Sequence, residues 1–273
     1  MISQLHSFRA RAAAGLLAVA FSGGGAAAAE NITGDIGFSY NSHFITYGLD
    51  VWGGSDNFFG KQSTYWIFGD AYLKANDWLT FSLSVWTDNN NNVPSGIGGN
   101  LQEVDINPGF SATFGKFTYS FTYNAWHYAG DVERSVDLAV AYDDTGLFME
   151  GFGFKPKVLW HYRADPNGGQ RIGSAIVASV SPTFKLGDSP ISLSIPAGIS
   201  FFTTETFQGG TSGGYGFGYL GGTLNYTIEA IPMSYGAWTL SVGLTEYFTR
   251  NAAIPSNPTE NFLTGSMGVT VAF

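Results

Sequence analysis

Residues 263–273 read LTGSMGVTVAF, and apolar residues alternate there with small or polar ones. A period of two is that of a β-strand, whose successive side chains point to opposite faces of the sheet. The segment therefore predicts a strand with one apolar face and one face of Thr, Ser, Gly and Ala. The apolar face comprises Leu263, Gly265, Met267, Val269, Val271 and Phe273.

The same alternation extends over most of the chain. Residues 79–87, 117–126 and 191–201 each set large apolar side chains against Ser, Thr, Asn or Gly. Helical periodicity is not sustained anywhere after residue 30. The pattern predicts twelve strands, at residues 32–46, 63–75, 79–88, 101–114, 117–127, 133–143, 150–163, 171–185, 190–202, 214–229, 237–249 and 260–273.

Four prolines fall inside these predicted strands. Proline donates no hydrogen bond to a β-ladder, so each one predicts a bulge or an interruption of the pairing. They are Pro108, Pro156, Pro182 and Pro196.

The connections between the predicted strands tend to alternate in length. Short turns follow every second strand, whereas most of the others are longer and rich in Gly, Asn or Pro, as in residues 89–100 and 203–213. Transmembrane barrels have short periplasmic turns and longer outer loops, whereas a β-sandwich has no reason to sort its loops in this way. We therefore predict an all-β chain that forms one transmembrane, antiparallel, up-and-down β-barrel of twelve strands over residues 30–273. The short turns are residues 76–77, 115–116, 143–146, 187–189 and 233–236.

Composition excludes several classes of protein. Aromatic residues make up 16% of the chain and charged residues 12%, which argues against a disordered chain. The net charge is −9 and no basic run exists, which argues against binding to nucleic acid. Cysteine is absent, so disulfides and thiolate metal sites are excluded.

Residues 1–29 have the pattern of a cleaved signal peptide. Arg9 and Arg11 precede the apolar stretch 12–21, and Ala27-Ala28-Ala29 offers small residues for cleavage before Glu30. About ten apolar residues are too few to span a bilayer as a helix. Export from the cytoplasm is therefore expected.

Tryptophans stand near both ends of the predicted strands. Trp78 and Trp238 follow short turns, and Trp86, Trp126 and Trp160 stand near the opposite ends. This distribution predicts two belts of aromatic side chains at the membrane interfaces.

The last residues, 267–273 (MGVTVAF), resemble the closing strand of Gram-negative outer-membrane proteins, in which a terminal Phe is recognised by the assembly machinery. Phe273 would be that signal. Residues 36–48, 103–109 and 119–128 also resemble a family of small proteobacterial outer-membrane proteins of uncharacterised function. That family typically has an Arg in its opening motif, where this chain has Thr46-Tyr47 before Gly48. The resemblance implies a barrel in the outer membrane of a Gram-negative bacterium.

The polar face of the strands would line the lumen, because Lys or Arg facing lipid near the midplane costs about 2–4 kcal/mol. The 143–146 turn joins two neighbouring strands, so Glu133 and Asp137 are expected to pair with Lys155 and Lys157. Such pairs either neutralise one another in a narrow barrel or act in gating and solute selection. The candidate lumen residues are Asp35, Asn41, His43, Asp70, Asp105, Asn107, Asp137, Lys155, Lys157, His161 and Lys185.

Twelve strands lie between filled eight-stranded barrels and open sixteen-stranded porins, so both a narrow pore and a plugged lumen are compatible with the sequence. An acidic outer mouth favours cations or neutral solutes over anions. We expect an outer-membrane channel for small, neutral or cationic solutes, working by passive diffusion without a cofactor. The acids assigned to the outer mouth are Asp50, Asp56, Asp88, Asp131, Asp165, Glu205 and Glu260.

Two other functions stay open. A structural barrel with a plugged lumen would bind a partner through its outer loops. An outer-membrane hydrolase would need a histidine base, for which His127, near Asp131, is available, although no recognisable lipase constellation accompanies it. The expected partners are outer-membrane lipid and lipopolysaccharide, the barrel-assembly machinery and small solutes.

Overall fold

The computed structural model describes residues 31–54, 57–128, 130–165 and 171–273. The predicted signal peptide, residues 1–29, lies outside these described residues, and so does Asp56. Among the described residues, no helix is long and apolar enough to cross a membrane.

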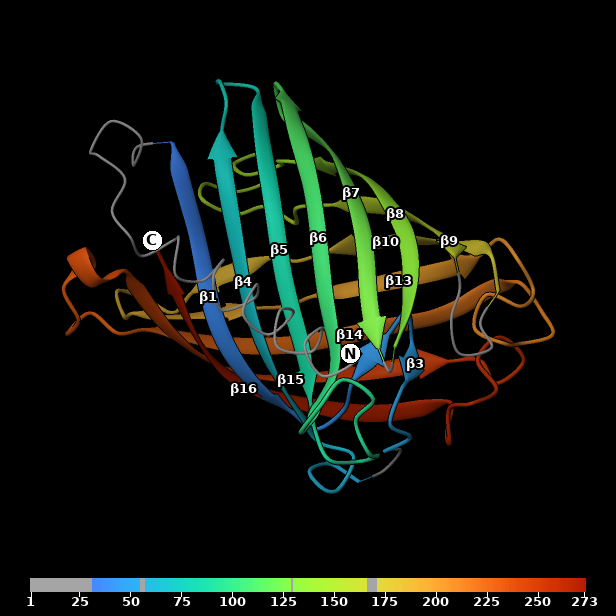
Figure 1. Ribbon diagram of the computed structural model, residues 1–273. Helices are drawn as coiled ribbons and strands as arrows, with labels where there is room; N and C mark the ends of the chain where they lie inside the picture. Colours follow the sequence, from blue (N-terminus) through green and yellow to red (C-terminus); the bar gives the residue numbers. More distant parts are fainter. Residues whose placement is uncertain (1–30, 55–56, 129, 166–170) are drawn as a thin grey trace, which may run out of the picture.

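Twelve antiparallel wall strands close into a barrel (Figure 1). The predicted fold class and number of strands are therefore confirmed. In order around the ring, the wall consists of β1 (Ile32–Asn41), β4 (Thr64–Lys74), β5 (Leu79–Asn89), β6 (Leu101–Phe114), β7 (Phe117–Tyr128), β8 (Asp131–Tyr142), β9 (Lys157–Asp165), β10 (Gly173–Val180) with β11 (Thr183–Lys185), β13 (Ala197–Phe202) with β12 (Ile191–Ser194), β14 (Gly214–Thr227), β15 (Ala237–Thr249) and β16 (Asn261–Ala272).

The first and last strands close the ring. β1 pairs with β16 from Asp35 opposite Ala272 to Asn41 opposite Ser266. Beyond this ladder, the N–H of Gly34 donates to the carbonyl of Phe273 at 3.0 Å, and the N–H of Phe273 donates back at 2.9 Å. Closure matters because an unpaired strand edge cannot be hydrated inside a bilayer.

The four in-strand prolines have different effects. Pro182 and Pro196 each split one wall strand, which gives the pairs β10/β11 and β12/β13. Pro108 stays within β6, and the β6–β7 ladder omits only residues 107 and 108 while keeping the same register on both sides. Pro156 lies immediately before β9 and ends a connection rather than interrupting a strand.

The predicted strand 150–163 begins too early, because β9 starts only at Lys157. Residues 143–156 form one long connection in place of the short turn that the sequence suggests. The Asp144 carboxylate organises it by accepting hydrogen bonds from the backbone N–H groups of Phe154 (3.0 Å) and Lys155 (2.8 Å). Lys155, at a φ of 53°, belongs to this connection and not to the barrel wall.

The two faces of the wall differ as the alternation predicts. Large apolar side chains on the outward face remain exposed, among them Phe38, Ile67, Phe81, Phe110 and Leu240. They are cross-strand neighbours, as Phe38 is of Ile67 and Phe81 of Phe110. Exposed apolar side chains over the whole outer wall are characteristic of a surface in contact with lipid.

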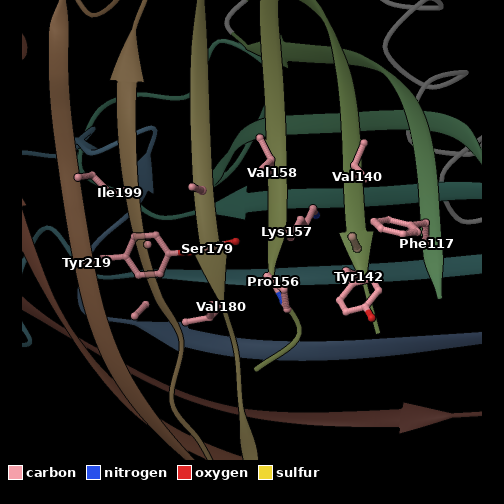
Figure 2. A pocket seen from close by; sticks show the side chains of 14 residues that line it. Phe117, Val140, Tyr142, Pro156, Lys157, Val158, Ser179, Val180, Ile199 and Tyr219 are labelled. Carbon is pink, nitrogen blue, oxygen red and sulfur yellow. The ribbon is translucent and has the colours of Figure 1, made fainter. Parts of the chain in front are cut away.

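The outward face also carries a depression of about 640 Å³ over β8, β9, β10 and β13. Most side chains around it belong to the outward-facing set, including Val140, Val158 and Ile199 (Figure 2). Its lining is almost entirely apolar, and side chains such as Val140, Val158 and Ile199 face lipid, so we do not regard it as a solute site.

We predict that deleting Phe273 impairs assembly of the barrel, because the deletion removes the Gly34–Phe273 hydrogen bonds and the terminal ring. The measurement is the amount of heat-modifiable protein, which migrates differently before and after boiling, in the outer-membrane fraction. Phe273→Ala is the matched control, since it keeps the backbone pair and removes only the ring. A normal yield from the deletion would contradict the role of Phe273 in closure.

Candidate functional site

A small hairpin lies in the connection between β1 and β4, at the end of the barrel opposite the C-terminus (Figure 1). It consists of β2 (Ile45–Thr46) and β3 (Leu49–Asp50), joined by the two residues Tyr47 and Gly48. Both turn residues have positive φ, 46° and 79°. Two positive φ values are typical of the turn that fits the twist of a two-residue hairpin.

The hairpin enters the lumen. The Tyr47 ring lies 4.1 Å from the ring of His161 and 6.5 Å from that of Trp126, measured between centroids. Both are inward-facing wall residues, on β9 and β7. Gly48 approaches Phe217 of β14 so closely that a Cβ atom there would lie 2.6 Å from the phenyl ring.

Two other loops at the same end hold the hairpin in place. The Asn257 amide accepts from the N–H of Asp50 at 2.8 Å and donates to the carbonyl of Gly48 at 2.8 Å. The Gln208 amide donates to the carbonyl of Thr46 at 3.0 Å. On this side of the lumen, hairpin residues Tyr47 and Leu49 pack against a small apolar core formed by Ala175, Phe202, Phe207, Phe217, Ala253 and Ile254.

A buried ion pair crosses from β8 to β9 beside the hairpin. Nε of Arg163 lies 2.6 Å from Oε1 of Glu133, and both side chains are almost completely buried. The Tyr128 hydroxyl donates to the second oxygen of Glu133 at 2.9 Å. Arg163 also donates to the carbonyl of Phe207, whose ring centroid lies 4.2 Å from the guanidinium carbon.

The predicted partners of Glu133 and Asp137 are therefore wrong. Glu133 pairs with Arg163, and Asp137 lies 2.6 Å from Nδ1 of His161, instead of contacting Lys155 and Lys157. The reason is register: the long 143–156 connection places Lys157 opposite Ala141, four residues along β8 from Asp137, whose cross-strand neighbour is His161.

On the other side of the hairpin lies a cavity of about 260 Å³. Its wall residues face inward from four adjacent strands, β4 to β7, and the hairpin segment provides the cover. Asp105 stands between two indoles, since it is the direct cross-strand neighbour of Trp86 and of Trp126. The lining is Phe44, Ile45 and Thr46 from the hairpin segment with Trp66, Trp86, Glu103, Asp105 and Trp126 from the wall.

Trp86 and Trp126 thus do not belong to an interfacial belt, contrary to the prediction. They face the lumen because they share the parity of the Ser and Thr residues on their strands. Trp78 and Trp160 do lie exposed on the outside, and Trp238 shares the outward face of Leu240.

Several buried polar atoms on the inward face have no hydrogen-bond partner among the described residues. They are Oδ1 of Asp105, Oδ1 of Asn107, Nε1 of Trp66, Nε2 of His161 and Nη2 of Arg163. A buried polar atom without a partner is costly, so these positions are suited to water or a polar solute. Within the described residues, no three His, Asp or Glu side chains converge as metal ligands would.

The other candidate lumen residues are distributed along the barrel. Asp35 and Asp70 are cross-strand neighbours in the inner half, and Lys157 and Lys185 lie exposed near the same end. At the outer end, Asn41 donates to Ser39 at 2.9 Å, and the His43 ring lies 6.0 Å from that of Phe262. Of the acids assigned to the outer mouth, Asp50 and Asp88 are buried rather than exposed.

The residues suggested for a hydrolase lie on the neighbouring strands β7 and β8. His127 alternates with Trp126 and shares the outward parity of Tyr123, whereas the backbone N–H of Val132 donates to Asp131 at 2.8 Å. Residues 210–214 have the spacing Gly-x-Ser-x-Gly, but they lead from a loop into the first residue of β14 instead of forming a strand-to-helix turn.

No protein-family model and no curated protein sequence matches this chain. Solved structures do match in fold. A NanC porin is similar over 87% of this chain and 98% of its own, with a TM-score of 0.52 and 8% identity. An outer-membrane channel from Pseudomonas putida F1 is similar over 89% and 96%, with a TM-score of 0.52 and 10% identity. LpxR from Salmonella typhimurium has a TM-score of 0.44 and 9% identity, over 87% and 99%.

At these identities the likeness concerns the fold. The chain folds as Gram-negative outer-membrane β-barrels do, and this fold, with its apolar outer wall, indicates an outer-membrane location. The resemblance to the family of small uncharacterised proteins stays a prediction.

We predict that Arg163→Met lowers the unfolding temperature markedly, because it leaves the Glu133 carboxylate buried without its partner. Breaking a buried ion pair from one side costs about 3–5 kcal/mol. The double variant Glu133→Gln with Arg163→Met should recover most of the loss. Heat modifiability on detergent gels, measured as a function of temperature, gives the midpoints. Equal midpoints for the wild type and Arg163→Met would contradict a stabilising role for the pair.

Proposed function

We propose that the protein is an outer-membrane channel through which small, neutral or cationic solutes diffuse passively. The observation that carries the proposal is the lumen itself: its inner half is polar and accessible, and its outer half is narrowed by a hairpin. Tyr72 and Lys157 both face inward yet remain exposed, which supports access from the inner end. The hairpin segment would form the constriction.

The charges of the outer half support a preference for cations. Asp88, Glu103, Asp105 and Glu133 all lie on the inward face of β5, β6 and β8, whereas Arg163 is the cation that compensates Glu133. The charge that remains on Asp88 and on the hydrogen-bonded pair of Glu103 and Asp105 would give a negative potential beside the constriction. In the inner half, Lys157 and Lys185 offset Asp35 and Asp70. An excess of acid beside a narrow passage favours cations over anions.

Single-channel recording in a planar bilayer under a KCl gradient tests the proposal. We expect discrete openings of low conductance with a reversal potential on the cation-selective side. A chain in which residues 44–51 are replaced by Gly and Ser should conduct more, because the constriction is removed. If both proteins are folded and both are silent, the lumen is plugged, and the structural or loop-binding alternative replaces the channel.

Two lysines provide a matched pair for selectivity. We expect Lys157→Gln to shift the reversal potential further toward cation selectivity, because Lys157 faces the lumen. Lys155→Gln removes the same charge from the connection outside the wall and should have a much smaller effect. Equal shifts, or no shift from Lys157→Gln, would show that ions do not pass this position.

A further inference from the structure

The cavity between the hairpin and strands β4 to β7 combines aromatic rings with two carboxyl groups. The Phe44 ring lies 5.2 Å from that of Trp86 and 6.0 Å from that of Trp66, and the two indoles are 5.2 Å apart. The interplanar angles are 50° to 75°, so the rings present differently oriented surfaces instead of a flat stack. Such an arrangement allows several ring faces to contact one small ligand.

The carboxyl groups come from Glu103 and Asp105, two residues apart on the inward face of β6. Their exposed fractions are 6% and 8%. Oδ1 of Asp105 lines the cavity and has no hydrogen-bond partner among the described residues. A buried carboxylate is stable only where a partner compensates its lost hydration.

The described basic side chains do not supply that compensation. Among the described residues, Arg163 is the basic side chain buried in the outer half, and it is engaged by Glu133 and by the carbonyl of Phe207. Arg134, nearby on β8, pairs with Asp165 at the surface. Lys157 lies four residues before His161 on β9, toward the inner end. Glu103 and Asp105 also share a side-chain hydrogen bond, which requires a proton on one of the two carboxyl groups. A cation that neutralises the remaining charge of this pair would therefore come from solution.

The chemistry of the lining favours an organic cation over a metal ion. Among the described lining residues, side-chain oxygens come only from Glu103, Asp105 and Thr46. Calcium takes six to eight oxygen ligands, which this set does not approach. Aromatic faces instead attract alkylated ammonium groups, which give up their hydration readily. A volume of about 260 Å³ suits a small molecule.

We propose that this cavity binds a small organic cation that carries an alkylated ammonium group. The ammonium lies between Asp105 and the indole of Trp86, with Trp66 and Phe44 against its alkyl substituents. The idea that such cations are the solutes of the channel rests on the proposed channel function. Binding of the cation in this cavity does not require that the barrel conducts ions.

Binding of choline chloride to the purified, folded protein in detergent tests the proposal. Trp66, Trp86 and Trp126 line the cavity, so intrinsic fluorescence should change saturably, and calorimetry gives an independent affinity. The controls are NaCl at equal ionic strength and 3,3-dimethylbutan-1-ol, an uncharged molecule of the same shape as choline. We expect saturable binding of choline and much weaker binding of the uncharged molecule.

Asp105→Asn should weaken choline binding by about tenfold or more, since it removes the charge that the ammonium contacts. Asp188→Asn makes the same change in a short turn outside the wall and should bind like the wild type. Trp86→Leu provides a second variant with the carboxylates intact, and heat modifiability verifies that each variant is folded. The aromatic contribution is supported if Trp86→Leu also weakens binding.

Three outcomes would overturn the proposal: no saturable choline binding by the folded wild type, an equal affinity for the uncharged molecule, or unchanged binding by Asp105→Asn and Trp86→Leu. The bilayer recordings separate this result from the channel. Binding without conduction supports the site and removes the channel, whereas conduction without binding keeps the channel and removes the site.

Discussion

The whole structure depends on the closure of one antiparallel ring in an environment without water. Hydrogen bonds between β1 and β16 remove the strand edges, and the closed wall then fixes two faces for every strand. Each second residue must contact lipid and each intervening residue must face the lumen. The parity of a side chain therefore determines its surroundings, and polar residues such as Asp105, Asp137 and His161 have no alternative to the interior.

The lumen, which is lined by the polar side chains of the wall strands, must be filled by protein or by water. At the outer end the hairpin fills it, and the lumen divides into two unlike parts. On one side Tyr47 and Leu49 complete an apolar core, and on the other Phe44 covers the cavity that contains Glu103 and Asp105. The Glu133–Arg163 pair lies along this division and ties two wall strands together. The arrangement concentrates uncompensated acid in one part only.

The sequence predicts the wall well because alternation is a local property. The same alternation places Trp86 and Trp126 with Ser and Thr on the inward face. Their positions in the alternating pattern were therefore enough to exclude them from an interfacial belt. The hairpin was not predictable in this way. Its position depends on hydrogen bonds such as those of Asn257 to Asp50 and Gly48, which span 207 and 209 residues. Asp144 similarly holds Lys155 outside the wall through contacts that no periodicity reveals.

In the proposed channel, the position of the cavity would have a consequence for the passage of a solute. Phe44, Ile45 and Thr46 belong to the hairpin segment, so a solute in the cavity contacts the constriction and the wall at once. By linkage, such a solute stabilises the arrangement in which the hairpin is in place. Passage then requires that binding be favourable enough for entry and weak enough for release. A cavity lined partly by the hairpin segment satisfies this condition more readily than one enclosed by the wall alone, because a displacement of Phe44 would remove part of the binding surface.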